Sequence, residues 1–297
     1  MKLIVAAIFA VLAVSAFAET ENWEIDWSQV VPVQDMPGFW DGREIRPAFY
    51  PGDMTRTGRI VGGVIVTPHS IPFQVALLMQ FGGGTGLCGG SRISNRAVLT
   101  AAHCPIGSSS TQIIFGAHSI TTVEPSQVRV TVPNNAAGYR LHAQYNPSNL
   151  NNDIAILITP GVVGASPQIQ VVGLALATAG TFAGTSTIVS GWGRISDASG
   201  ATSAVLRSVD NVVITNAVCA ATYGGIIIAS TICISTTGGR GTCNGDSGGP
   251  LTVAAGGARS QVGVVSFGAA AGCQQGFPAG FARVSAFRGW IDTNMQP

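Results

Sequence analysis

Short apolar runs, several of them alternating with polar residues, recur along most of the chain and are separated by segments rich in Gly and Ser. Short runs with period-two alternation are typical of β-strands, whereas an amphipathic helix needs a longer stretch with apolar positions three and four apart. The pattern therefore predicts an all-β fold. The predicted strands cover residues 73–79, 96–101, 112–115, 127–132, 154–158, 185–190, 206–214, 251–253 and 261–266.

Two segments depart from this pattern. Near the C-terminus, Phe287, Trp290 and Ile291 lie at i, i+3 and i+4, which predicts a short amphipathic helix. Residues 84–89 fit the G-x-G-x-x-G string of dinucleotide-binding loops, but no acidic residue follows before Glu124 and no strand–helix–strand pattern surrounds them. We interpret them as a glycine-rich hairpin loop.

The chain before residue 60 divides into two segments of unlike composition. Residues 1–18 have a charged start at Lys2, an apolar run that is too short to span a bilayer, and small residues at Ala16 and Ala18. This pattern predicts a secretory signal and an extracellular protein. Residues 19–59 have eight acidic residues, four arginines and no cysteine, a net charge of −4. They are too few to build a core unaided, so we expect an activation propeptide with no disulfide to hold it after cleavage.

Residues 60–297 form the predicted mature protein. Their ten arginines and six acidic residues give a net charge of +4, so the propeptide and the mature part are expected to attract each other. The only lysine of the chain is Lys2. A lysine-free mature part is typical of a protein from an alkaline, protease-rich fluid such as a gut lumen, although drift in composition gives the same pattern.

All six cysteines also lie in the mature part. An even number of cysteines in an exported chain predicts disulfides, and the sequence alone leaves fifteen pairings open. No Cys-x-x-Cys pair and no paired histidine spacing indicates a metal site, so we expect neither a metal nor another cofactor.

Three residues of the mature part suggest nucleophilic catalysis. Ser247 lies in a glycine-rich turn at residues 245–250, His103 follows an apolar run, and Asp153 precedes another. A serine hydroxyl needs an imidazole base that is oriented by a buried carboxylate. Each residue alone has a plainer interpretation, as a surface turn, a core histidine or a turn-capping aspartate. The order His, Asp, Ser, with roughly 50 and 90 residues between them, matches one known arrangement of the catalytic triad.

Six segments in this order match motifs of one family, and on them the chain resembles the chymotrypsin family of serine proteases from Ile60 to the C-terminus. Segments 215–219 and 278–284 are similar to the secreted digestive chymotrypsins of insects. The resemblance implies two six-stranded antiparallel β-barrels that divide within residues 160–172, with a catalytic cleft between them. The six segments are 59–63 (RIVGG), 88–91 (CGGS), 100–104 (TAAHC), 152–155 (NDIA), 191–193 (GWG) and 245–250 (GDSGGP).

The resemblance also implies roles for individual residues. His103, Asp153 and Ser247 form the triad, and the N–H groups of Gly245 and Ser247 form the oxyanion hole. Ser266 is expected near Asp153. The implied disulfides are Cys88–Cys104, Cys219–Cys233 and Cys243–Cys273.

Activation is expected to follow cleavage after Arg59, which frees the amino group of Ile60 to pair with Asp246. Cleavage after Arg56 is an alternative, but it leaves Thr57 at the new terminus, which fits an apolar pocket poorly.

Specificity is expected to follow from Gly241 at the floor of the substrate pocket, between walls at Gly268 and Ala279 and beside Ser266. A floor without a carboxylate leaves a buried Lys or Arg unpaired, so Phe, Tyr or Leu is expected before the scissile bond. Ala279 stands where many relatives have Gly, and the narrower base that results favours Leu or Met as the alternative.

The implied function is that of a secreted serine endopeptidase of protein digestion, made as a zymogen. Two alternatives stay open: a catalytically silent homologue that serves as a binding module, and a regulatory protease of a cascade. Silent homologues usually lack a triad member, and regulatory proteases usually carry a cysteine-knotted module, which residues 19–59 lack. The expected partners are protein and peptide substrates, an activating trypsin-like protease and protein protease inhibitors. We expect a monomer that binds neither nucleic acid nor membrane.

Overall fold

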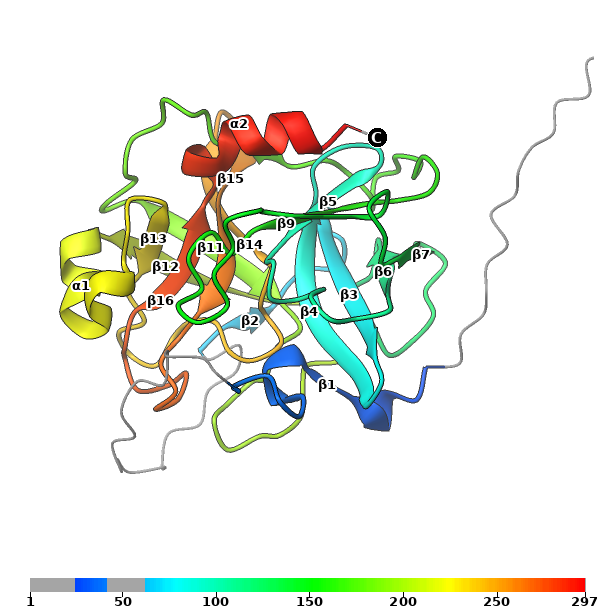
Figure 1. Ribbon diagram of the computed structural model, residues 1–297, viewed down its shortest axis with the longest axis horizontal. Coiled ribbons are helices and arrows are strands. Elements are labelled where there is room, and N and C mark those ends of the chain that lie inside the picture. Colours follow the sequence, from blue (N-terminus) through cyan, green and yellow to red (C-terminus); the bar gives the residue numbers. More distant parts are fainter. Residues whose placement is uncertain (1–24, 42–61, 297) are drawn as a thin grey trace, which may run out of the picture.

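The computed structural model describes residues 25–41 and 62–296, and these form two β-sheets that lie side by side with helix α2 across one end (Figure 1). The predicted signal at residues 1–18 and the predicted activation site at Arg59 and Ile60 lie outside the described residues. Part of the predicted propeptide, residues 25–41, lies inside them.

The first sheet has the strand order β7-β6-β3-β4-β5-β9-β8, all antiparallel. Its central strand β3 is buried on both faces: Val75, Leu77 and Met79 enter the main core, and Ala76 and Leu78 enter a second apolar cluster. Burial on both faces explains why this run is apolar throughout instead of alternating. The strands are β3 (Gln74–Phe81), β4 (Gly84–Arg92), β5 (Ala97–Thr100), β6 (Ser110–Phe115), β7 (Val128–Pro133), β8 (Tyr139–Leu141) and β9 (Ala155–Ile158).

The second sheet closes into a six-stranded barrel, because β15 pairs with both β14 and β16 and the ring returns through β13, β12 and β11. Closure removes the unpaired edges of these strands. Two short strands extend the barrel: β2 pairs with β12, and β10 pairs with β15. The strands are β2 (Val64–Ile65), β10 (Gly173–Leu174), β11 (Ser186–Gly191), β12 (Arg207–Ile214), β13 (Thr231–Ile234), β14 (Pro250–Ala255), β15 (Ala258–Phe267) and β16 (Ala279–Arg283).

These two barrel-like sheets confirm the predicted fold class, and every predicted strand overlaps an observed one. The chain leaves the first sheet at Ile158 and enters the second at Gly173, in agreement with the expected division. The predicted C-terminal helix is α2 (Val284–Asn294), which buries Phe287 and Ile291. The strand count differs from expectation in the first sheet, which has seven strands from residues 62–296 and an eighth, β1, from residues 25–41.

Two local predictions need correction. Residues 84–89 are not a hairpin loop but the first part of β4, because their glycines allow close packing rather than a turn: a Cβ at Gly89 would lie 3.0 Å from the Cα of Gly249. Helix α1 (Asn216–Tyr223) was not predicted, since Cys219 is its only buried residue. It is capped by Thr215, whose side chain accepts a hydrogen bond from the N–H of Val218. A short 3-10 turn, η3 (Gly224–Ile226), follows it.

The N-terminal segment adds a strand to the first sheet. It contains η1 (Trp27–Gln29), β1 (Val30–Pro32) and η2 (Val33–Asp35). β1 pairs in parallel with β4, with Val30 beside Thr85 and Pro32 beside Leu87. Val30 and Val33 are buried in the two apolar clusters of the mature part, so the segment uses that core and has none of its own.

Three disulfides join the six cysteines: Cys88–Cys104, Cys219–Cys233 and Cys243–Cys273, the pairing that the family resemblance implies. Each closes a short loop of the chain, which reduces the conformational entropy of the unfolded state. Among the described residues, no helix is long and apolar enough to cross a membrane.

Candidate functional site

The register of β5 and β9 brings His103 and Asp153 together. Thr100 at the end of β5 pairs with Ala155 at the start of β9, so the chain leaves one strand toward His103 beside the place where it enters the other from Asp153. The Cys88–Cys104 disulfide links the residue after His103 to β4. Two residues 50 positions apart thus meet because their strands are neighbours.

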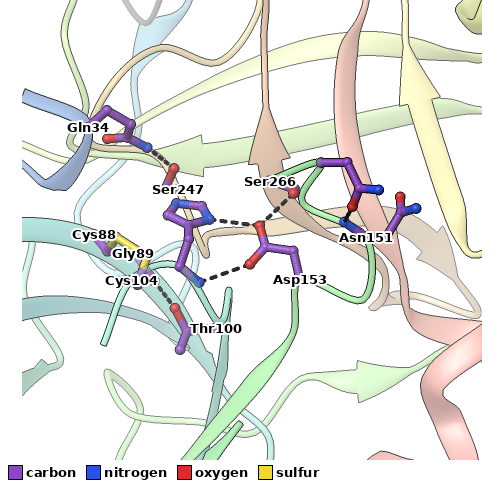
Figure 2. Close-up of polar contacts among 11 residues, drawn as sticks. Gln34, Cys88, Gly89, Thr100, Cys104, Asn151, Asp153, Ser247 and Ser266 are labelled. Carbon is purple, nitrogen blue, oxygen red and sulfur yellow. Dashed lines mark hydrogen bonds and ion pairs between the residues drawn. A yellow bond between two sulfur atoms is a disulfide. The ribbon is translucent and has the colours of Figure 1, made fainter. Parts of the chain in front are cut away.

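The carboxylate of Asp153 holds His103 at two points (Figure 2). One oxygen accepts the backbone N–H of His103 at 2.9 Å, and the other lies 2.7 Å from Nδ1 of the ring. Ser266, on β15 of the second sheet, donates its hydroxyl to the same second oxygen at 2.6 Å. Both Asp153 and His103 are almost fully buried. A buried carboxylate with three donors around it fixes the orientation of the imidazole and supports a positive charge on it.

Ser247 lies in a tight turn just before β14, and the glycines around it are required by close contacts. A Cβ at Gly248 would strike the hydroxyl of Thr100, and Gly248 has a φ of +77°. A Cβ at Gly249 would lie 2.8 Å from the backbone oxygen of Asp246. The backbone oxygen of Ser247 accepts the N–H of Gly89 at 2.7 Å, which fastens the turn to the first sheet.

Asp246, the residue before Ser247, is almost fully buried. Its two carboxylate oxygens accept the N–H groups of Gly193 and Cys243, at 2.8 and 2.9 Å. Burial raises the pKa of Asp246 to about 6, against the opposing effect of these two hydrogen bonds. A Cβ at Gly193 would lie 2.5 Å from the carboxyl carbon, so the glycines of the 191–193 motif make room for the side chain.

The nucleophile itself contacts a residue that the sequence analysis did not identify. The side-chain amide of Gln34, in η2, donates to Oγ of Ser247 (Figure 2). The side-chain oxygen of Gln34 accepts the N–H of Gly245 at 3.3 Å. Within the described part of the chain, Nε2 of His103 has no hydrogen-bond partner. His103 and Ser247 are 1% and 3% exposed. The opposite charges of propeptide and mature part were the only sequence signal for this contact.

A cavity of about 370 Å³ lies beside Ser247. Three of the residues that were predicted to bind substrate, Ser266, Gly268 and Ala279, line this cavity. Gly241 does not: it is buried, and a Cβ there would lie 2.8 Å from Cγ2 of Thr236, which does line the cavity. Other lining residues are Leu150, Asp197, Thr242, Val265, Phe267 and Phe277, together with Gln34, Phe39 and Trp40 from the propeptide.

Two groups of side chains among the described residues are close enough together to be considered as metal ligands. One is Cys88, His103 and Cys104, and the other is Asp197, Cys243 and Cys273. In both groups the sulfur atoms belong to disulfides and are not thiolates. Neither group therefore has the donors that a zinc or iron site requires.

Comparison with known proteins places the whole two-sheet unit within one family. Residues 60–291 match the family model described as Trypsin. Brachyurin of Leptuca pugilator is 43% identical over 234 residues, which cover 79% of this chain and 97% of brachyurin. Chymotrypsin of Phaedon cochleariae is 33% identical over 291 residues, 97% of this chain and 96% of its own, so that alignment also includes most of the residues before Ile60.

A solved structure agrees with these sequence matches. The structure of HL collagenase at 1.7 Å resolution is 33% identical and aligns with a TM-score of 0.69 over 78% of this chain and 97% of its own. The family model begins before β2 and ends within α2, so it spans both sheets apart from β1.

Proposed function

The chain belongs to the trypsin family and is a serine endopeptidase, and from this premise we propose that it is a secreted digestive zymogen that uses His103, Asp153 and Ser247 and cleaves after large apolar residues. The observation that supports the catalytic roles best is the pair of contacts from Asp153 to His103, 2.9 Å to the backbone N–H and 2.7 Å to Nδ1, beside a serine in a glycine turn. This arrangement leaves Nε2 as the ring nitrogen that is available to a nucleophile.

In the proposed mechanism, Oγ of Ser247 attacks the carbonyl carbon of the scissile bond while Nε2 of His103 takes the hydroxyl proton. Asp153 stabilises the imidazolium that forms. The N–H groups of Gly245 and Ser247 stabilise the negative charge that develops on the carbonyl oxygen. His103 then passes the proton to the leaving amine, and water releases the acyl group from Ser247 by the same sequence of proton transfers.

Activation is proposed to proceed by cleavage after Arg59. The new ammonium group of Ile60 would then enter the pocket of Asp246, whose raised pKa reflects a buried carboxylate that lacks a compensating cation. The gain of this ion pair is expected to order the turn that contains Gly245 and Ser247. A trypsin-like protease is the proposed activator, because the bond follows an arginine.

The proposed preference for Phe, Tyr or Leu rests on the lining of the cavity. Its apolar part includes Val265, Phe277 and Ala279. Asp197 also lines it, but this residue is exposed and uses its carboxylate to accept the N–H groups of Cys273 and Gln274. A basic side chain would therefore be buried there without a free carboxylate, which is costly.

The test is to express the full chain, cleave it with trypsin, inhibit the trypsin, and profile the bonds that the product cuts in a mixed peptide library. We expect cleavage after Phe, Tyr and Leu and labelling of Ser247 by a serine-directed phosphonylating reagent. Ser247→Ala should abolish the labelling and lower turnover by at least about ten-thousand-fold. Near-normal turnover by this variant would contradict the proposed mechanism.

A further inference from the structure

Residues 30–40 of the propeptide, here called the cleft segment, cover the catalytic residues. β1 is paired with β4 along Thr85, Gly86 and Leu87, and the chain then passes over Ser247 and His103. The near-complete burial of both catalytic side chains follows from this position. The segment is therefore a peptide already seated in the cleft, and its contacts show what recognises it.

The carboxamide of Gln34 occupies the place of a reacting amide. Its oxygen accepts from the N–H of Gly245, the expected oxyanion donor, and its nitrogen donates to Oγ of Ser247. The group presented to the nucleophile is thus an N–H donor and not a carbonyl carbon, and it uses a lone pair that attack would need. The same contact leaves Nε2 of His103 without a partner among the described residues. Gln34 thereby contacts both the serine and an expected oxyanion donor through its side chain.

Asp35 anchors the segment next to this contact. Its carboxylate lies 2.6 Å from a guanidinium nitrogen of Arg194 and accepts the side-chain amide of Asn244 at 2.9 Å. Arg194 and Asp35 are 26% and 21% exposed, so solvent screens their attraction only in part. The opposite net charges of residues 19–59 and 60–297 thus include one specific ion pair, between Asp35 and Arg194.

Apolar packing holds both ends of the segment. Val33 is 2% exposed and lies against Gly86, where a Cβ would come within 2.6 Å of its Cγ2 atom. The absence of a side chain at Gly86 makes the room that Val33 fills. Phe39 stacks edge-on against the ring of His103, with centroids 5.7 Å apart, and packs against Trp40. The mature part is therefore shaped to receive this segment.

We propose that the mature enzyme carries a binding surface for its own propeptide, formed by the edge of β4, Arg194, Asn244 and Ser247, and that residues 25–41 bind there noncovalently in trans after release. This inference rests on the proposed roles of Ser247 and Gly245. In the uncleaved chain the tether keeps the local concentration of the segment high, in the millimolar range, which favours occupancy even where the free peptide binds weakly. Residues 25–41 contain no Lys or Arg, so a trypsin-like activator leaves them intact.

The experiment uses the trypsin-activated enzyme, freed of propeptide by gel filtration in high salt, and a synthetic peptide of residues 25–41. A fluorescein-labelled copy gives binding by anisotropy, which needs no turnover, and the unlabelled peptide is tested against hydrolysis of a chromogenic substrate. We expect competitive inhibition, with the peptide recovered intact by mass spectrometry. Phosphonylation of Ser247 should abolish binding.

Two glutamines of the peptide provide a matched pair. Gln34→Ala should weaken binding at least about tenfold, because two buried hydrogen bonds are lost. Gln29→Ala, at an exposed position whose side chain donates a hydrogen bond to the neighbouring Ser28, should change affinity less than about twofold. Asp35→Ala should weaken binding about fivefold at low salt and less at high salt.

An active enzyme that does not bind the peptide at up to about 1 mM overturns the inference and leaves the proposed function intact. Equal losses for the two glutamine variants, or cleavage of the peptide as an ordinary substrate, also overturn it. An enzyme that binds the peptide with the expected difference between Gln34 and Gln29 but hydrolyses no substrate supports the binding surface and contradicts the proposed function.

Discussion

Asp153 and Asp246 are both almost fully buried, yet their surroundings differ. The carboxylate of Asp153 forms hydrogen bonds with the backbone N–H and the ring of His103 and accepts the hydroxyl of Ser266. Within the described part of the chain, the carboxylate of Asp246 accepts hydrogen bonds from two backbone N–H groups and from no side chain, and burial raises its pKa to about 6. The first carboxylate has the ring of His103 as a partner within the folded chain, whereas the second has no ion pair among the described residues.

If activation proceeds by cleavage as proposed, this difference separates the part of the site that is complete in the uncleaved chain from the part that is not. The His–Asp pair depends on strands β5 and β9, which form in the uncleaved chain. The pocket of Asp246 depends on a charge that peptide-bond cleavage would create. The two carboxylates are held by different elements. The His103–Asp153 pair can therefore form before cleavage, while the turn that contains Asp246 and Ser247 depends on the proposed cleavage.

The largest expected effect comes from Asp153→Asn. The amide cannot accept from Nδ1 and stabilise the imidazolium in the same way, so kcat of the activated enzyme should fall about ten-thousand-fold. Thermal unfolding of the uncleaved variant should show that the fold persists. Asp292→Asn, an exposed position on α2, serves as the control. A loss of less than about tenfold would mean that Asp153 does not orient His103.

Asp246→Asn should act differently before and after cleavage. In the activated enzyme the variant leaves the Ile60 ammonium without its charge partner, and activity should fall at least about a hundredfold, since breaking a buried pair costs about 3–5 kcal/mol. In the uncleaved chain there is no such pair to break, so the variant should fold without this loss. Activity after trypsin treatment and denaturant unfolding before it are the measurements.

The pH dependence of the uncleaved chain sharpens this contrast. Because the pKa of Asp246 is raised on folding from 3.8 to about 6, the folded state binds this proton more tightly than the unfolded state. The stability it contributes is full below the unfolded pKa and is lost as the pH rises through about 6, a difference of about 3 kcal/mol in the free energy of unfolding. Asp246→Asn should remove this part of the dependence of the free energy of unfolding on pH. If the free energy of unfolding of the variant changes between about pH 4 and 6.5 as steeply as that of the wild type, Asp246 is not the group responsible.

The smallest effect is expected for Ser266→Ala. Loss of the 2.6 Å hydrogen bond to Asp153 removes one of three donors, and kcat should fall about tenfold with KM for small substrates little changed. Ser266→Thr keeps the hydroxyl on a β-strand and should restore most of the activity. If both variants behave alike, the side chain acts through packing and not through its donor.

Much of the molecule was determined by local sequence pattern. The apolar runs predicted the strands, because alternation and burial are properties of neighbouring residues, and the spacing of Phe287, Trp290 and Ile291 predicted α2. Motifs and their order marked the glycine turn at Ser247 and the residues His103 and Asp153. The sequence alone left fifteen cysteine pairings open, and the observed pairing was implied only by the family resemblance.

Tertiary structure alone decided the contacts between distant segments. Gln34 and Ser247 are 213 positions apart, and no local pattern marks that glutamine as the residue that reaches the nucleophile. The glycines of β4 appeared to be a loop because the close approach of Val33 and Gly249 that requires them is set by packing. Gly241 lies behind Thr236 and not at the cavity surface for the same reason. The local sequence pattern determines which face of a strand or helix is apolar. Which residues pack against that face depends on where distant segments of the chain fold.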